Sequence, residues 1–126
     1  MNVSIADSTG TLVPLAVSVV DVSGWHSTTV NNSRITPDID GLYRLHASVE
    51  WGSSAIDESV SRFYVNGSGT PKSICRFVGT NVVGSHVNMH FVELTAGDYV
   101  EIYVLQNSGS ARPATIQLSC ELVRAS

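Results

Sequence analysis

The stretch HVNMHFVEL-TAGD-YVEIYVLQNSG, residues 86–109, decides the fold class. Apolar residues recur at every second position on both sides of a Gly-Asp turn, which predicts two strands joined as a β-hairpin. In the first strand Val87, Met89 and Phe91 share one face, and the opposite face is also partly apolar. A strand with two apolar faces is usually covered on both sides. We therefore expect another subunit to supply the second cover.

The rest of the chain shows the same alternation in other runs. The clearest run, residues 42–51, carries an apolar set on one face: Tyr43, Leu45, Ala47, Val49 and Trp51. Turn residues separate the runs, and no segment keeps a helical spacing of apolar residues for more than one turn. Eight or more short strands without crossover helices predict an all-β antiparallel sandwich or barrel.

Length and composition favour a single domain. A chain of 126 residues can bury a core as one unit, so we expect one domain over residues 1–126. Residues 1–12 are largely polar, and we expect them to form an N-terminal arm without a role in the core. Two cysteines, Cys75 and Cys120, are too few for a disulfide scaffold. Buried free thiols are the expected state, and a single bridge is the alternative.

The charge balance argues against several kinds of partner. Only 14% of the residues are charged, and 7 basic against 11 acidic residues give a net charge of −4. A nucleic-acid-binding surface needs clustered Lys and Arg, so we expect no nucleic acid as partner. No apolar window is long enough to span a bilayer, so no membrane is expected. The first apolar segment lacks a basic leader, which predicts synthesis in the cytoplasm without a signal peptide.

No cluster of reactive residues predicts catalysis or metal binding. His86 and His90 share a strand face but lie about 13 Å apart, which is too far for one ion within a subunit. Three copies of one histidine on a threefold axis are the weaker alternative. The acidic loop residues do not have the spacing of an EF-hand, and no serine lies in a Gly-x-Ser-x-Gly frame. We therefore expect no enzyme, no catalytic or metal-binding residue and no cofactor.

Aromatic residues are better candidates for binding. Tyr99 and Tyr103 share the face opposite Val100 and Ile102, and Trp25 lies in a polar segment. Aromatic rings on a sheet face can stack on sugars or anchor a protein, so these three are candidate partner or glycan contacts. The simpler alternative is that they pack under a loop or against a neighbouring subunit.

Four sequence signals, in this order, resemble the jelly roll shared by the tumour necrosis factors (TNFs) and the globular heads of complement-one-q. They are Gly-Leu-Tyr at 41–43, Asn-Gly at 66–67, LTAGDYV at 94–100 and QNSG at 106–109. The likeness extends over about residues 25–123. It implies a TNF-like antiparallel jelly-roll sandwich.

The resemblance also implies a homotrimer, in which one sheet of each subunit packs around a threefold axis. The strand before the Gly-Asp turn, the strand after Gly41 and the final strand would face that axis. By position, the apolar part of the interface would consist of Val87, Met89 and Phe91. The neighbouring strand would add a polar layer of Arg44, His46 and Glu50.

The chain departs from the animal members of this family. It has no collagen-like repeat and no receptor-binding cysteine framework, and its richness in Ser, Thr, Asn and Gly is similar to the versions in bacteriophage virions. The resemblance then implies a non-enzymatic structural protein of the virion surface, a trimeric capsid decoration (cement) protein bound to the major capsid protein on the capsid exterior. The N-terminal arm would grip the shell, or swap onto a neighbouring subunit, through Met1, Asn2, Val3, Ser4 and Ile5. The alternatives are a receptor- or glycan-binding knob of a phage fibre and, less favoured, a secreted ligand of the TNF or complement type.

Overall fold

The computed structural model describes residues 2–15, 24–27, 29–51, 56–70, 73–82 and 84–126. All regular structure in these ranges is β-strand. In chain order the strands are β1 (Asn2–Ile5), β2 (Thr11–Leu12), β3 (Gly41–Glu50), β4 (Ile56–Val65), β5 (Ser68–Gly69), β6 (Cys75–Val82), β7 (Ser85–Leu94), β8 (Val100–Asn107) and β9 (Arg112–Ala125).

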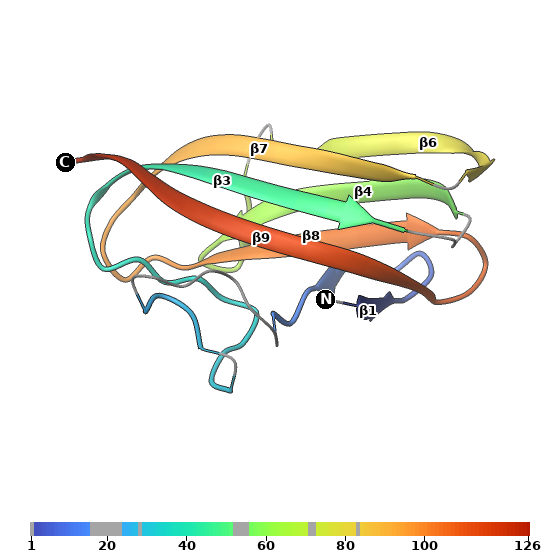
Figure 1. Cartoon of the computed structure of the whole chain (residues 1–126), viewed down its shortest axis with the longest axis horizontal. Coiled ribbons are helices and arrows are strands. Elements are labelled where there is room, and N and C mark those ends of the chain that lie inside the picture. The colour runs from blue at the N-terminus through green and yellow to red at the C-terminus, as the bar shows by residue number, and fades with distance from the viewer. Residues whose placement is uncertain (1, 16–23, 28, 52–55, 71–72, 83) are drawn as a thin grey trace.

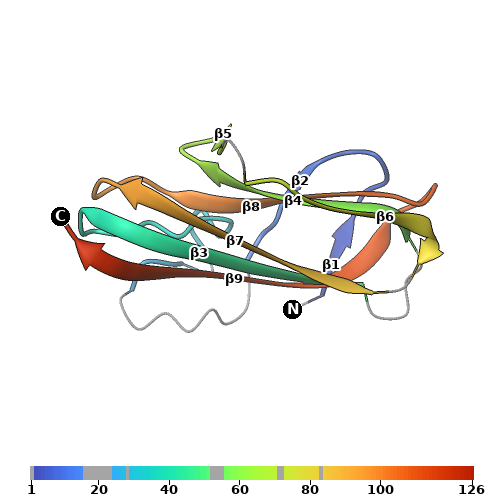
Figure 2. The same ribbon diagram turned by 90° about the horizontal axis from the view of Figure 1, so that it is seen from above.

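The strands form two antiparallel sheets that pack face to face (Figures 1 and 2). The first, called the β3 sheet below, has the strand order β1-β9-β3-β7. The second, the β4 sheet, has the order β2-β8-β4-β5, and β6 also pairs with β4. The predicted all-β antiparallel sandwich is confirmed.

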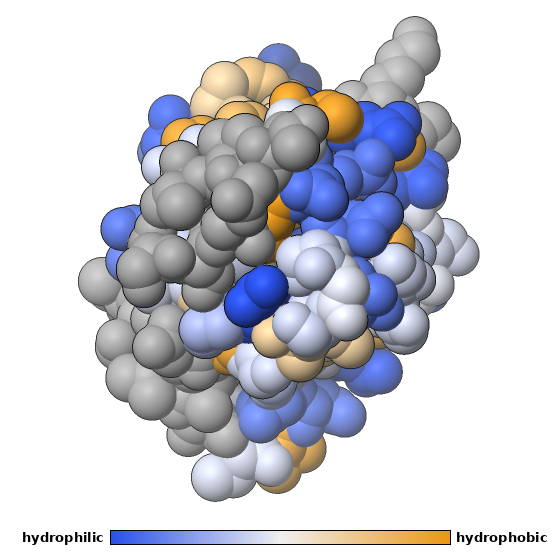
Figure 3. All heavy atoms as spheres, turned by 90° about the vertical axis from the view of Figure 1, so that its right-hand side faces the viewer, coloured by the Kyte–Doolittle hydropathy of each residue, from blue (hydrophilic) through white to orange (hydrophobic). Residues whose placement is uncertain are grey.

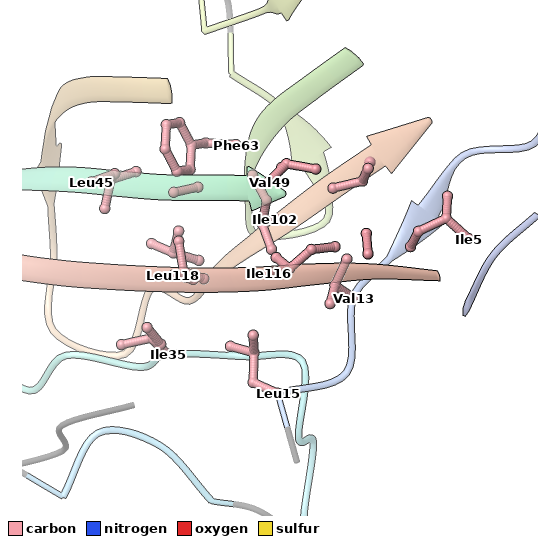
Figure 4. Packing of buried hydrophobic residues seen from close by; sticks show 14 of the residues in the cluster. Ile5, Val13, Leu15, Ile35, Leu45, Val49, Phe63, Ile102, Ile116 and Leu118 are labelled. Atoms are coloured by element: carbon pink, nitrogen blue, oxygen red, sulfur yellow. The ribbon is translucent and has the colours of Figure 1, made fainter. Parts of the chain in front are cut away.

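Alternation within the strands builds the core between the sheets. In β3, Tyr43, Leu45, Ala47 and Val49 are fully buried, as the sequence predicts, whereas the residues between them face outward. Phe63 of β4 belongs to the same cluster and packs from the opposite layer (Figure 4). Burial of an aliphatic or aromatic side chain of this size contributes roughly 1.5–3 kcal/mol. The cluster shared by both sheets is therefore the main source of stability.

The two strands of residues 86–109 do not pair with each other, so the predicted hairpin pairing is wrong. β7 pairs with β3, from Gly41 opposite Leu94 to Glu50 opposite Ser85, whereas β8 pairs with β4 in the other sheet. The turn at 95–98 therefore carries the chain from one layer to the other (Figure 1). A turn signal determines only that the chain reverses. The strand partners are decided by the long β3 and β4 ladders, which are distant in sequence.

Hydrogen bonds explain why the Gly-Asp turn has this sequence. The Asp98 carboxylate accepts hydrogen bonds from Asn66 Nδ2 at 2.9 Å and from Thr95 N at 2.8 Å, and both lower the pKa of Asp98. Asn66 Oδ1 in turn accepts a hydrogen bond from Tyr99 N at 3.1 Å. Gly97 has a φ of 96°, a conformation that costs a residue with a side chain more than it costs glycine. The turn is thereby tied to the one that follows β4.

The N-terminal segment is part of the fold, and the predicted arm without a core role is wrong. β1 pairs with β9, with Asn2 opposite Thr115, and the Ile5 side chain is fully buried. Val3 also packs against the core cluster. The physical reason is that Val3 and Ile5 both point between the sheets, so this short segment adds an apolar edge strand to β9.

Polar side chains fasten this segment to the last third of the chain. Gln106 is buried and donates from Nε2 to the Ile5 carbonyl oxygen at 3.0 Å. The Asp7 carboxylate accepts hydrogen bonds from Ser108 N and Gly109 N, both at 2.9 Å, and these bonds lower its pKa. The first residues of the chain are thus held by both β9 and the turn that precedes it.

The close approach of β9 to Gly41 gives a first testable prediction. A Cβ atom at Gly41 would lie 2.4 Å from the Arg124 carbonyl oxygen and 2.8 Å from Leu122 Cδ1. Because a backbone atom cannot move aside cheaply, Gly41→Ala should lower the free energy of unfolding by about 1–3 kcal/mol. Urea unfolding curves at a fixed protein concentration would measure the loss.

Gly84→Ala is the matched control for this prediction. At Gly84 the nearest atom to a new Cβ, Phe77 Cζ, would lie 3.8 Å away, which is ordinary van der Waals contact. This variant should change the free energy of unfolding by less than about 1 kcal/mol. Equal losses in both variants would contradict the packing of β9 over Gly41.

Candidate functional site

The outer face of the β3 sheet carries large apolar side chains that the single chain leaves exposed. Val87, Met89 and Phe91 on β7 are 58%, 53% and 51% exposed. We call these three residues the β7 patch. They alternate with residues that point between the sheets, such as Asn88, which is 6% exposed. Adjacent exposed apolar residues of this size mark an interaction surface more often than isolated ones do.

The predicted polar layer lies beside the β7 patch on the same face. In the β3–β7 ladder Arg44 is opposite Phe91 and His46 is opposite Met89. Glu50 is exposed at the far end of β3. The structure therefore brings the six predicted interface residues onto one sheet face. Their contact with a second subunit stays a prediction.

The resemblance implies that the final strand, β9, faces the threefold axis, but the predicted interface residues include none of its side chains. Glu121 forms an ion pair with Arg44, and Val123 is 51% exposed. Another ion pair, Arg124–Glu93 at 3.3 Å, links β9 to β7 across β3. For Glu121 and Val123 the alternation of β9 contained the signal, because its apolar residues at even positions leave the odd positions facing outward, whereas Arg124 lies beyond a register shift of the β3–β9 ladder. Both ion pairs are solvent-exposed and contribute little to stability, so they are free to rearrange in an assembly.

Other parts of the surface are more polar. Figure 3 shows one end of the sandwich, where polar residues predominate and apolar residues gather along the upper rim, on the side of β6 and β7. Ile74 and Val78 on this side are 57% and 66% exposed. Val78 belongs to β6 and therefore to the β4 sheet, not to the face that carries the β7 patch.

Two of the three aromatic candidates make specific contacts within the chain. Trp25 donates from Nε1 to Asp38 Oδ1 at 2.9 Å and packs edge-on against Tyr43, with 5.8 Å between the ring centroids. The guanidinium carbon of Arg34 lies 3.9 Å from the centroid of the Tyr99 ring. These contacts agree with the alternative that the rings pack under loops, because each already has a partner inside the subunit.

Tyr103, the third aromatic candidate, is also engaged within the chain. Its ring stacks on Tyr64 with a centroid distance of 5.1 Å and an interplanar angle of 7°. Gly10 packs so closely against the same ring that an added Cβ would meet its atoms at about 2 Å. A ring held between these two residues has little face left for a sugar. A contact of these three aromatic residues with a partner or glycan stays a prediction.

The N-terminal residues predicted to contact the capsid shell lie away from the β7 patch. Residues 2–5 form β1 at the opposite edge of the β3 sheet from β7, and Met1 lies outside the described residues. Ile5 is buried and cannot reach a partner without unfolding its strand. The buried side chain of Ile5 therefore does not fit the predicted shell contact, whereas a contact through Met1, Asn2, Val3 and Ser4 stays a prediction.

Reactive groups are scattered rather than gathered into a site. No three His, Cys, Asp or Glu side chains in the described ranges are placed to hold a metal ion together. Cys75 and Cys120 are free and half-buried. Burial raises the pKa of both thiols, that of Cys120 to about 12, which disfavours the nucleophilic thiolate at neutral pH. Within the same ranges, no helix has the length and hydrophobicity to cross a membrane.

The comparisons with known proteins give the fold its name. No family model and no curated protein matches the sequence. Among solved structures, the globular domain of zebrafish complement 1qA is similar, with a TM-score of 0.58, 14% identity, and 99% of this chain and 98% of that one covered. The Eiger TNF of S. frugiperda has a TM-score of 0.65 at 9% identity, with 99% and 87% covered.

A virion protein has the same architecture. The vertex protein P5 of the phage PRD1 has a TM-score of 0.64 and 15% identity, with 96% of this chain and 87% of that one covered. At these identities the likeness shows the fold and not a shared activity. The sequence-based expectation of fold is confirmed: the chain is a TNF-like jelly roll, the fold of the complement-one-q heads and of a phage vertex protein.

Proposed function

We propose that this protein is a non-enzymatic structural component of a phage virion, a homotrimer that decorates the capsid and binds the major capsid protein. The observation that carries the proposal is the exposed β7 patch on a fold that a phage vertex protein shares. Exposed apolar surface of this kind is usually buried against a partner, and another copy of the same chain is the simplest partner.

The arrangement of the β3 sheet supports self-association. The β7 patch supplies apolar area, and the charged and polar side chains of β3 and β9 surround it. Interfaces are commonly built in this way, with an apolar centre and a polar rim. Packing three such faces around one axis buries the patch of every subunit at once.

Threefold symmetry also suits a partner made of repeated subunits. Three identical weak contacts act together when the partner shell offers the same symmetry, so that the trimer binds far more tightly than one subunit. Because β1 holds residues 2–5 within the sandwich, we place the contact with the shell on the loops at an end of the trimer rather than on an N-terminal arm.

Light scattering after size-exclusion chromatography tests the trimer. The expected mass is three times the 13.4 kDa of one chain. A mass of one chain at micromolar concentration would overturn the assembly. Purified virions analysed by gel electrophoresis test the location, because a decoration protein occurs in many copies, in proportion to the major capsid protein. Absence from virions would refute the virion role even if the trimer is correct.

A receptor- or glycan-binding knob is the second candidate function. It is favoured by the likeness to a protein that is named for the vertex of its virion. The same gel separates the two roles, because a knob would be present in only a few copies per particle. Binding to host cells by the isolated trimer would further support the knob.

A further inference from the structure

Polar side chains occupy the space between the two sheets beside β7, β4 and β6. Four of these residues are only 0% to 6% exposed although their side chains are polar: Ser59, Ser61, Ser73 and Asn88. We call the group the polar seam: Trp51, Ser59, Ser61, Ser73, His86 and Asn88. Buried polar groups are uncommon in an apolar core and have to be satisfied by one another.

Hydrogen bonds of the polar seam attach β7 to the opposite sheet. Asn88 Nδ2 lies 3.2 Å from Ser61 Oγ and 2.7 Å from the Ser73 carbonyl oxygen, and it donates to both. Trp51, directly after β3, donates from Nε1 to Ser59 Oγ of β4 at 3.0 Å and so joins the two sheets beside β7. Because β7 is the last strand of the β3 sheet, the bonds of Asn88 hold an edge strand that has a ladder on only one side.

His86 is the member of the seam that can change its charge. Its Nε2 lies 3.2 Å from Ser61 Oγ, and its Nδ1 is shielded from solvent without a hydrogen-bond partner. A neutral ring needs only one donor position, whereas the charged ring carries two N–H donors. In the charged ring Nε2–H can donate to Ser61 Oγ, which has a lone pair beside the one that accepts from Asn88, but Nδ1–H becomes a buried donor that has no acceptor.

Among the residues that the structure describes, no carboxylate makes a hydrogen bond or ion pair with His86. Of the neighbouring titratable residues, Cys75 on β6 and His90 on β7 lie on the inner sides of their strands, and neither is an anion at neutral pH or below. Of the charged groups on the adjoining strands, Glu50 on β3, Glu58 on β4 and Arg76 on β6 lie on the outer faces of the sheets, and Asp57 at the start of β4 is exposed to solvent. Glu58 is already paired with Arg76.

We propose that His86 is an acid-sensitive latch, which holds β7 against the β4 sheet while its ring is neutral and releases the strand when the ring is protonated. Burial lowers the pKa of His86 from its usual value of 6.5. The opened or unfolded chain therefore takes up the proton more readily than the closed one. The stabilisation is complete above about pH 6.5 and is lost as the pH falls toward the lowered pKa of the closed state.

The latch also bears on assembly, a step that rests on the proposed trimer. Val87 and Met89 project from the same strand as His86, on its opposite face. Displacement of β7 would move the β7 patch, so acid that opens the latch would also dissociate the trimer. If the protein is monomeric at neutral pH, the link between the latch and assembly is refuted. The latch itself is still tested by the measurement on Trp51 described next.

Trp51 is a built-in reporter of the polar seam. It is 2% exposed and donates to Ser59, and the other tryptophan, Trp25, can be replaced by phenylalanine. In the Trp25→Phe protein, acidification from about pH 7.5 to about pH 5 should shift Trp51 emission to longer wavelength and increase its quenching by acrylamide. Unchanged emission and quenching over this range would overturn the proposal.

The variant His86→Gln tests whether protonation of His86 causes the acid-induced change in Trp51 emission. Glutamine can still donate to Ser61 but does not titrate, so the acid-induced change in Trp51 emission should disappear. Persistence of the same transition in this variant would refute the latch. If the variant does not fold, the ring signals of His86 in the wild-type protein decide by NMR: titration with a midpoint below about 6.5 supports the latch, and a midpoint at or above this value refutes it.

Discussion

Replacing Met89 and Phe91 with aspartate should convert the proposed trimer into folded monomers. Both side chains are about half exposed in the single chain, at 53% and 51%, so charge at these positions costs the isolated subunit little. In the assembly the same change would bury two carboxylates per subunit without partners, near the copies from the other subunits. Unpaired buried charges of this kind cost several kcal/mol each. The mass from light scattering should fall to that of one chain, while the near-ultraviolet circular dichroism should stay native.

A second pair of aspartates serves as the matched control. Ile74 and Val78 are at least as exposed, at 57% and 66%, but Val78 lies in the β4 sheet. Ile74→Asp with Val78→Asp should leave the mass of the assembly unchanged. A double variant at Met89 and Phe91 that remains a stable trimer would show that β7 does not line the interface. Dissociation by both pairs would show that the effect is not specific to β7.

Ile5→Ala should cause the largest loss of stability that we expect from a single truncation near a chain terminus. The side chain is fully buried in the core cluster, so its removal loses transfer free energy and leaves a cavity. Such truncations cost about 2–5 kcal/mol. Urea unfolding would show a lower midpoint with little change in slope. The protein concentration has to be equal for all variants, because assembly adds to apparent stability.

Ser4→Ala on the same strand is the control for this prediction. Ser4 is exposed and lies opposite Pro113, so its truncation should change the free energy of unfolding by less than about 0.5 kcal/mol. If Ile5→Ala were equally mild, β1 would be only loosely attached, and a role for this segment outside the sandwich would again be reasonable.

The sequence predicted best what depends on local alternation. The buried face of β3, from Tyr43 to Val49, follows directly from a period of two over ten residues. The same rule put Val87, Met89 and Phe91 on one face of β7, and the family resemblance indicated which sheet that face belongs to. These inferences succeed because each needs only the positions within one strand.

The errors concern partners that are distant in sequence. The turn at 95–98 predicts a reversal, but no local signal tells whether β7 and β8 pair or enter different sheets. β1 is four residues long, and two inward side chains, Val3 and Ile5, are too few to establish a period. The polar seam was also missed, because serine and asparagine on a strand ordinarily indicate the solvent face.

The pairing of β1 with β9 has a consequence for how the protein is made. Residues 2–5 leave the ribosome before the other strands of the sandwich, yet their partners at 112–115 belong to the strand that leaves after all the others. The sheet that carries the β7 patch therefore cannot close during translation, and contacts of such long sequence separation form slowly. In the proposed trimer, a subunit would become ready to associate only after residues 112–125 have emerged, so that assembly would follow the synthesis of the whole sandwich.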